Sequence, residues 1–238
     1  MSKKYKNHVK NHKIKIRKIF ILAVIITSLK INTYSQGNVS IHFGSSLPVS
    51  DFKSDDINNE EAGGAAIGFN LGINYIYPLS NNHFGLIGGI DVNYNGLTKK
   101  TKDEVENYFE MNGVYYSDIK FYKYINIPVT FGLNYTFLAD QKIVPYVNTG
   151  MVLNFLKITN MEVDSYGQIV TSKFDIASNL GLTIGCGILI SNKISFSLNY
   201  LALGKHDIKG EISSSGYSEN IEDKQKVDIL TLTIGFRL

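Results

Sequence analysis

The sequence predicts an all-β protein, an eight-stranded antiparallel up-and-down transmembrane β-barrel. Three observations lead to this prediction. Large apolar side chains alternate with small polar ones, with period two, along most of the chain after residue 36. The segments between the alternating stretches are long and short in turn. Charged side chains gather in the long segments, which hold 27 of the 36 charged residues that follow residue 35. This combination is typical of barrels that cross a bacterial outer membrane.

The beginning of the chain has the pattern of an export signal. It carries nine basic residues and no acidic one, with an apolar run of 11 residues at positions 19–29. That run has the length of a signal-peptide core and is too short to span a bilayer. We therefore expect residues 1–35 to be a signal peptide, cleaved near Ser35/Gln36. Residues 36–238 are expected to form the outer-membrane β-barrel domain.

The basic character of this first segment would also fit an arm that binds nucleic acid. Such an arm has no use for an apolar run rich in isoleucine, so we favour export. Without the segment the chain keeps 15 basic and 21 acidic residues. An acidic domain is repelled by phosphate backbones, so no nucleic-acid partner is expected.

The expected strands are the eight stretches in which the alternation is clearest. In one of them, Ile125, Ile127 and Val129 alternate with Asn126 and Thr130. Each stretch offers one large apolar face and one face of Gly, Asn, Ser and Thr. The expected strands cover residues 38–44, 65–79, 83–96, 121–137, 143–157, 174–190, 193–203 and 227–238.

The connections between these strands predict which end of the barrel carries the long loops. An up-and-down sheet places all long loops at one end, and the short turns with both termini at the other. We expect a short helix at residues 102–111, within the second long loop. The long loops are residues 45–64, 97–120, 158–173 and 204–226, and the short turns are residues 80–82, 138–142 and 191–192.

The two faces of the strands predict which side meets lipid. Because the second face is small and almost uncharged, we assign it to a narrow lumen and the large apolar face to lipid. Asp91 then points inward, and aromatic side chains form girdles at both ends of the strands. Pro128 lacks a backbone donor inside a strand, so we expect a β-bulge there.

Four short motifs, in this order and spacing, resemble the eight-stranded PorT-like outer-membrane barrels of the Bacteroidota, within the wider OmpA-like class. They are Tyr34-Ser35-Gln36, the stretch 124–129 (Tyr-Ile-Asn-Ile-Pro-Val), the run 181–187 (Gly-Leu-Thr-Ile-Gly-Cys-Gly) and the ending 233–238 (Thr-Ile-Gly-Phe-Arg-Leu). The resemblance covers nearly all of residues 36–238. It implies an outer-membrane barrel, and the family also includes a component of type IX secretion machinery.

A search for chemistry yields no site. Cys186, the one cysteine, has the lipid-facing parity and is expected to be inert. His206, Asp207 and the serines 213–215 could in principle support acyl transfer, but adjacent His and Asp side chains seldom converge. The acidic clusters of the first two long loops lack the spacing of a Ca²⁺ loop. We predict that the protein is not an enzyme, with no catalytic, cofactor-binding or metal-binding residues and no cofactor.

The sequence thus predicts a non-enzymatic outer-membrane barrel with a structural or surface-interaction role. Its expected partners are outer-membrane lipid and, through the long loops, other envelope proteins. Two alternatives stay open: an accessory barrel of a type IX-like secretion machine, which rests on the resemblance, and a lipid-modifying enzyme that uses His206. Eight strands are too narrow for a general diffusion pore.

Overall fold

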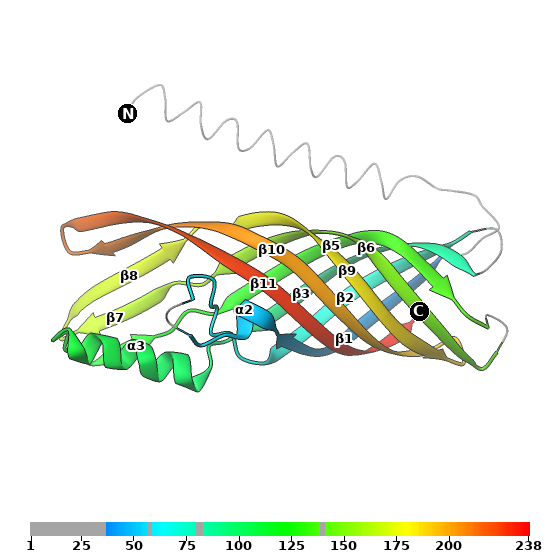
Figure 1. Ribbon diagram of the computed structural model, residues 1–238, viewed down its shortest axis with the longest axis horizontal. Helices are drawn as coiled ribbons and strands as arrows, with labels where there is room; N and C mark the ends of the chain where they lie inside the picture. Colours follow the sequence, from blue (N-terminus) through cyan, green and yellow to red (C-terminus); the bar gives the residue numbers. More distant parts are fainter. Residues whose placement is uncertain (1–36, 57–58, 80–82, 139–140) are drawn as a thin grey trace, which may run out of the picture. The chain divides into compact units, whose positions relative to one another are not determined.

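A computed structural model describes residues 37–56, 59–79, 83–138 and 141–238 (Figure 1). The expected signal peptide, its cleavage site and the turn at 80–82 lie outside the described residues. Within them, no helix has the length and apolar character needed to cross a membrane. The elements in chain order are β1 (Asn38–Pro48), α2 (Ser50–Lys53), β2 (Gly68–Pro78), β3 (Phe84–Asn95), α3 (Lys99–Met111), β4 (Asp118–Lys120), β5 (Tyr124–Thr136), β6 (Ile143–Ile158), β7 (Met161–Ser165), β8 (Gln168–Phe174), β9 (Ala177–Ile190), β10 (Ile194–Ser214) and β11 (Tyr217–Arg237).

Eight of these strands close into a ring. β1, β2, β3, β5, β6, β9, β10 and β11 pair antiparallel in that order, and β11 pairs with both β10 and β1. The stagger of the strands can be followed from one paired residue to the next around the ring. The path starts at Tyr146 on β6 and comes back to β6 at a different residue, Leu156. The strands are therefore staggered and tilted, as closure requires. The predicted fold class, an eight-stranded antiparallel barrel, is confirmed.

Of the short turns expected at the end of the barrel where β1 begins and β11 ends, the one after β9 is fully described, and it is one residue longer than expected. Residues 191–193 join β9 to β10; Lys193 N donates to Ile190 O at 3.0 Å, and Ser191 and Asn192 both have positive φ (51° and 57°). This backbone matches the right-handed twist of the strands that it joins, so a short connection suffices. We call this the turn end and the opposite end the loop end.

At the loop end, two segments expected to be loops are β-hairpins. β10 and β11 run on together to a turn beyond Ser214, and residues 161–174 form the hairpin β7–β8. β8 pairs with β10 from Gly210 to Ser213, and β7 pairs with β4, so the sheet continues past the ring (Figure 1). The expectation of loops there was wrong because it sought large apolar residues alternating with small uncharged ones. In these strands charged residues alternate with apolar or small ones instead, as Glu162 and Asp164 do with Val163, which is the pattern of a strand in water. The expected helix at 102–111 is confirmed and begins earlier, at Lys99.

The bulge expected at Pro128 is absent. The pairs Ile90–Val129 and Asn93–Asn126 lie in one register on either side of it, and only the ladder between them is interrupted. Pro128 also keeps its partner on β6, Asn154. The backbone donor that Pro128 lacks is thus accommodated by a local gap in the pairing of β5 with β3. An irregularity occurs instead between Ala202 and Gly204 on β10, where Gly204 has φ +75°.

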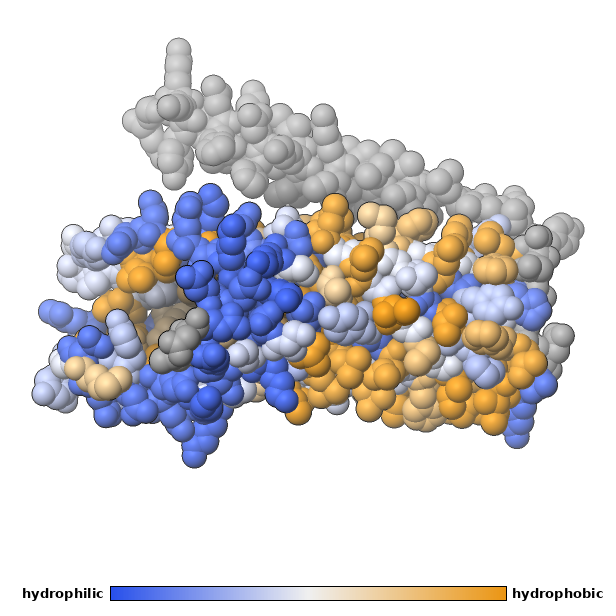
Figure 2. Space-filling view, viewed as in Figure 1, coloured by the Kyte–Doolittle hydropathy of each residue, from blue (hydrophilic) through white to orange (hydrophobic). Residues whose placement is uncertain are grey.

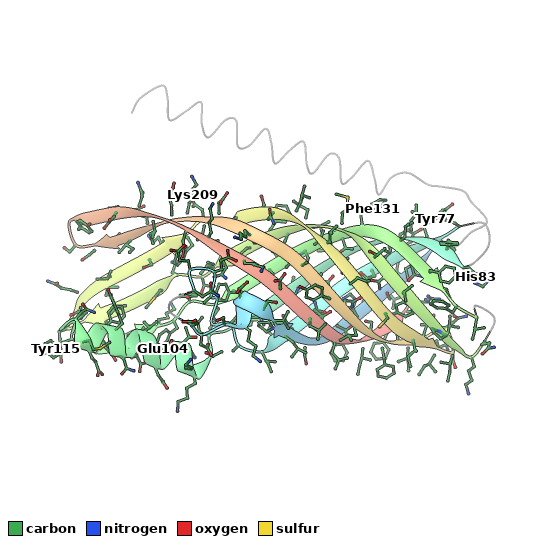
Figure 3. All side chains as sticks on the ribbon, viewed as in Figure 1. Tyr77, His83, Glu104, Tyr115, Phe131 and Lys209 are labelled. Atoms are coloured by element: carbon green, nitrogen blue, oxygen red, sulfur yellow. The ribbon has the colours of Figure 1, made fainter. Side chains whose placement is uncertain are left out.

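The faces of the wall follow the predicted assignment. Large apolar side chains stand outward and are exposed; for example, Phe131 is 66% exposed, and Figure 3 shows it on the outer side of the wall. Figure 2 shows these side chains as an orange band over the turn-end part of the barrel, next to a blue loop end. We call this band the apolar belt. It includes Phe43, Phe69, Leu71, Ile73, Ile90, Phe131, Leu133, Met151, Leu182, Ile184, Leu198, Leu232 and Ile234.

Aromatic rings mark the turn end of the belt as predicted. Tyr135 makes edge contacts with Phe84 and Phe137, each with 4.8 Å between ring centroids. At the loop end, Tyr94 stacks on Phe69 at 5.1 Å. The girdle predicted at that end also included Phe121, Phe155, Phe174 and Tyr200. Phe155 and Tyr200 are exposed as expected, whereas Phe121 and Phe174 are partly buried against an internal core.

The lumen inside the belt is filled by side chains. Inward glycines make room for larger neighbours: a side-chain carbon at Gly72 would collide with Asp91 and His42. At Gly132 such a carbon would collide with the backbone oxygen of Thr149 on the next strand, which cannot move aside. Inward-facing Asn and Thr side chains occupy the remaining space, among them Asn70, Asn93, Thr183, Thr231 and Thr233, all buried.

Gly132→Ala is expected to lower the free energy of unfolding by about 1–3 kcal/mol, because the added carbon overpacks two backbones. The measurement is a urea titration of the refolded protein in detergent, followed by heat-dependent gel mobility. Gly96→Ala is the matched control, since a carbon there meets no atom within 4 Å. Equal urea midpoints for the two variants would contradict this packing.

Candidate functional site

Inside the ring, at the level of the apolar belt, an acid–base pair lies within a chain of hydrogen-bonded asparagine side chains. His42 Nε2 lies 2.6 Å from Asp91 Oδ1, confirming that Asp91 points inward. Asn70 donates to Asp91 and to Asn93, each at 3.0 Å. Because Asp91 has a partner on either side, its burial among apolar strands is tolerated.

A second buried group lies nearer the loop end. Asn154 donates to Asn126 Oδ1 at 2.8 Å and lies 3.0 Å from Nε2 of His206. His206 is fully buried on β10, beyond the apolar belt, and burial lowers the pKa of its imidazole. A neutral imidazole is therefore the stable form near pH 7.

The residues considered for acyl transfer are not brought together. His206 points inward with no exposed surface, whereas Asp207 follows it on the exposed face of the same strand. Ser213 donates to the backbone oxygen of Thr171 on β8. A substrate cannot reach the imidazole, so this set offers no catalytic centre in the described arrangement.

The first long segment, residues 49–64 as far as it is described, closes the loop end of the barrel. Ser50, with φ 52°, turns the chain from β1 into α2, and Val49 donates to the backbone oxygen of Asp228. Phe52 on α2 is fully buried, with its ring 4.9 Å from that of Tyr124. We call this segment the plug; the core beneath it includes Ala65, Leu97, Val152, Leu156, Leu201, Leu203, Val227 and Ile229.

Sequence reasoning missed the plug, although a signal for it exists. At the loop ends of the strands, inward positions carry large apolar residues such as Tyr124, Leu156 and Ile229, instead of Gly or Asn. Such residues need an apolar partner inside the ring, and Phe52 supplies it.

Polar contacts hold the plug at its edge. Lys226 Nζ on β11 lies 2.7 Å from Asp51 Oδ2, and Lys205 pairs with Glu61. Tyr124 donates its hydroxyl to Gly63 O at 2.7 Å. The hydrogen bond from Lys226 lowers the pKa of Asp51, so the pair is ionised at neutral pH.

The plug also carries the helix of the second long segment. Thr98 caps α3 by accepting from the backbone of Thr101 at 3.1 Å. Both threonine hydroxyls donate to Asp55 in the plug, at 2.5 and 2.7 Å. Burial raises the pKa of Asp55, but these two hydrogen bonds outweigh burial and leave it lowered. Plug and helix therefore form one connected unit.

The far end of α3 meets the β7–β8 hairpin. Ser165 donates to Tyr115 O at 2.6 Å, and Ser117 N donates to Asp164 O at 2.8 Å. Figure 3 shows Tyr115 at this junction. Several tyrosine and apolar side chains here are exposed, with Met111 80% and Tyr166 79% exposed. We call this surface the tip patch: Tyr108, Met111, Val114, Tyr115, Tyr166 and Ile169.

The acidic clusters of the long segments do not assemble. Among the described residues, no group of three or more His, Cys, Asp or Glu side chains is placed to hold a metal ion. Several of the carboxylates pair with lysines or hydroxyls instead, as Asp51, Asp55 and Glu61 do.

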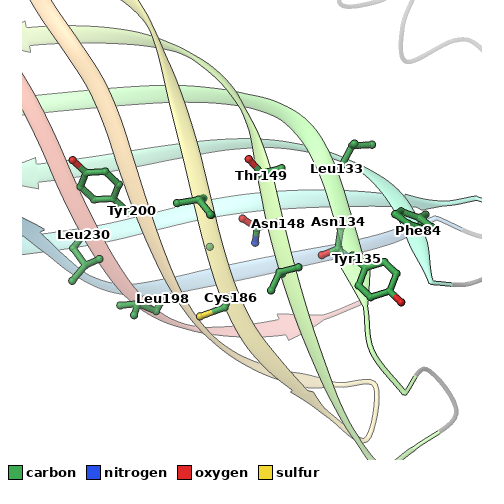
Figure 4. Close-up of a pocket in the computed structure, with 13 residues that line it drawn as sticks. Phe84, Leu133, Asn134, Tyr135, Asn148, Thr149, Cys186, Leu198, Tyr200 and Leu230 are labelled. Carbon is green, nitrogen blue, oxygen red and sulfur yellow. The ribbon is translucent and has the colours of Figure 1, made fainter.

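The outer wall is hollowed within the belt, in a space of about 540 Å³ (Figure 4). Small side chains, Thr149 and Cys186, lie between larger ones such as Leu133, Ile184 and Leu198. Tyr135 and Tyr200 also line it. Cys186 is exposed, as its predicted parity requires.

The family profile for the outer membrane protein beta-barrel domain matches residues 34–205. The chain belongs to this family. Solved structures similar to it include Neisserial surface protein A, with 16% identity and TM-score 0.43 over 85% of this chain and 96% of that one. Ail of Yersinia pestis has 17% identity and TM-score 0.42, over 87% and 100%. OprG of Pseudomonas aeruginosa has 13% identity and TM-score 0.48, over 88% and 99%. No curated protein matches the chain.

Because the chain belongs to this family, each end of the barrel can be assigned to one side of the outer membrane. In outer-membrane barrels the apolar belt meets hydrocarbon, the short turns face the periplasm and the long segments are extracellular. The plug and the tip patch are then extracellular features. The more specific resemblance to PorT-like barrels of the Bacteroidota stays a prediction.

Cys186 offers a direct test of the wall's orientation. In lipid vesicles, neither an uncharged nor a charged, membrane-impermeant maleimide is expected to label Cys186, because maleimides react with the ionised thiolate and hydrocarbon does not solvate a thiolate. Both reagents should label Cys186 once the protein is unfolded in denaturing detergent. The control is Asp207→Cys in a Cys186→Ser background, which should react with the charged reagent. Labelling of Cys186 by the charged reagent would place this face in water.

Lys226→Met is expected to loosen the plug at pH 7, so that the amides of Gly63, Gly64 and Ala65 exchange hydrogen severalfold faster. These amides donate to plug carbonyls. Lys224→Met, at an exposed position of the same strand, is the control. Because folding lowers the pKa of Asp51, the contact stabilises the plug above 3.8, the ordinary value, and is lost as pH falls through the folded pKa.

Protection relative to intrinsic exchange should therefore fall below pH 3.8 in the wild type. The acid loss should be smaller in Lys226→Met, where Asp55, whose pKa is also lowered, still contributes to it. Unchanged protection in Lys226→Met at pH 7 would show that the other contacts of the plug, those of Phe52 and Tyr124 among them, hold it without this ion pair.

Proposed function

We propose that this protein is a non-enzymatic outer-membrane barrel that acts in surface interaction through the tip patch. The observation that carries this proposal is the exposure of Tyr108, Met111, Tyr115 and Tyr166 together on the extracellular part of the chain. Exposed apolar patches of this kind mark interaction sites on soluble surfaces. Tyrosine and methionine are both enriched at protein interfaces, and tyrosine buries a large area at little cost in conformational entropy.

The support beneath the patch favours binding. Its residues come from α3, the segment before β4 and the β7–β8 hairpin, which hydrogen bonds join. A surface that is ordered before its partner arrives loses less entropy on association. The partners that fit are outer-membrane lipid around the belt and other envelope or surface proteins at the tip.

The filled lumen supports a role other than diffusion. Gly72 and Gly132 are sites where even a methyl group would collide with its neighbours, and the plug covers the extracellular mouth. A lumen packed in this way leaves the outer and distal surfaces as the parts that can act on other molecules.

The two alternatives have less support. An accessory role in type IX-like secretion rests on the resemblance alone and stays a prediction. The lipid-modifying alternative required His206 to reach a substrate, and the complete burial of this side chain speaks against it.

Tyr115→Ser/Tyr166→Ser is expected to abolish most of the attachment that the protein confers. The protein and its variants are expressed in a laboratory bacterium that has an outer membrane and normally lacks the protein. The measurement is the number of cells that adhere to polystyrene and to one another. Hot-spot side chains each contribute about 2 kcal/mol or more, so the loss should exceed tenfold. Surface labelling must show equal amounts of each variant.

Tyr217→Ser is the matched control, because Tyr217 is an exposed tyrosine on the other extracellular hairpin. It should leave attachment unchanged. If cells with the wild-type protein attach no better than cells without it, the proposal is wrong. Equal loss in the control and the double variant would assign attachment to tyrosines in general rather than to the tip patch, and would equally overturn it.

A further inference from the structure

Three lysines near the extracellular edge of the apolar belt have no carboxylate partner among the described residues, a property they share with Lys53, Lys99, Lys173 and Lys224 further out. Five lysines of the extracellular region form ion pairs with carboxylates: Lys100, Lys120, Lys205, Lys209 and Lys226. Lys102, Lys123 and Lys157 take part in no ion pair within the described part of the chain. We call these three the rim lysines.

The rim lysines rest on aromatic rings and a carbonyl instead. Lys123 Nζ lies 5.6 Å from the ring centroid of Tyr94, and Lys102 Nζ lies 5.7 Å from that of Phe121. Lys157 donates to the backbone oxygen of Phe174. None of these contacts removes positive charge, so each ammonium group still attracts an anion.

Two of the rim lysines are neighbours on the outer face. Lys157 pairs in register with Ile125, and Lys123 continues the ladder by pairing with Thr159. Lys123 and Lys157 are thus diagonal neighbours on adjacent strands and share the outward parity of Ile125 and Phe155. Diagonal positions of this kind lie about 7–8 Å apart. The two ammonium groups point apart in this structure, one to Tyr94 on β3 and the other to Phe174 at the end of β8. Both flexible stems must therefore swing toward each other to hold one anion.

The position of this pair indicates the kind of anion. Towards the turn end, the same outward rows continue into Val129, Leu153 and Met151 of the belt, which meet hydrocarbon. Tyr94 and Phe155 lie where aromatic side chains mark the membrane interface. An anion bound here would therefore sit at headgroup depth, with its apolar part beside the belt.

We propose that Lys123 and Lys157, assisted by Lys102, bind the phosphate of an anionic lipid headgroup in the outer leaflet. Lysine is suited to this task because its ammonium is a compact charge with three donors on a flexible stem. Such a site would fix the depth and rotation of the barrel in the membrane. It is independent of the tip patch and of the function proposed for it.

The test uses the full barrel in nonionic detergent, with bound lipid counted by native mass spectrometry. Dioleoyl phosphatidic acid is expected to bind more tightly than dioleoyl phosphatidylcholine. Lys123→Gln/Lys157→Gln should weaken the binding of phosphatidic acid about 25-fold, or about fivefold for each lysine near a membrane surface. Lys209→Gln/Lys224→Gln removes the same charge from the distal hairpin and should leave binding unchanged.

Heat-dependent gel mobility must show that both double variants keep the closed barrel. The proposal is overturned if the rim variant binds phosphatidic acid as tightly as the wild type, or if phosphatidylcholine binds equally well. It is also overturned if inorganic phosphate at the same concentration displaces the lipid, since the site would then recognise free phosphate. Equal weakening in the distal control would assign the effect to net charge and reject a site at the rim.

Discussion

The pairing of β11 with β1 is the interaction on which the rest of the structure depends. In hydrocarbon there is no water to satisfy a backbone donor or acceptor, so a sheet can cross a membrane only when it has no edge. Closing eight strands fixes a narrow, strongly tilted ring. Most of the large side chains must then stand outside, because the narrow inside is filled mainly by Gly, Asn, Ser and Thr with a few larger residues such as His42.

The inside of the ring changes character where the strands leave the belt. Within the belt the lumen is polar, with His42, Asp91 and Asn70 joined by hydrogen bonds. Beyond it the interior is apolar and packs Tyr124 and Leu156 against Phe52 of the plug. This inversion follows from the solvent. In water the hydrophobic effect drives apolar residues inward, whereas in hydrocarbon it places no such demand on the outer face.

This inversion also explains how far the sequence could predict the structure. The membrane-spanning parts, their two faces and the inward Asp91 were predictable, because a single period-two pattern of apolar and small residues specifies them. The same rule does not apply outside the membrane. The charged alternation of residues 204–226 gave no strand signal under it, so β10 and β11 appeared to end early.

The plug and the tip patch were less predictable for a different reason. Phe52 lies in a segment of mostly polar and charged residues, and its partners come from β5, β6, β10 and β11. No local pattern connects such residues. The exposed tyrosines of the tip are likewise ordinary in a sequence, and only their meeting at the end of α3 makes them a surface. The absent bulge at Pro128 has a similar origin, since β5 keeps its register through its partner on β6.

The extension of the sheet beyond the ring leaves an unpaired strand edge on β11. The extracellular half of β11, from Tyr217 to Gln225, has β10 on one side, and β1 already ends at the pair Pro48–Ile229. An exposed strand edge of this length invites pairing with other chains. Its side chains include Glu219, Glu222, Asp223 and Lys224, and charged side chains along an edge oppose such pairing. The charged character of this strand therefore protects the edge, while the tip patch, whose own residues are uncharged, is left free to make contacts.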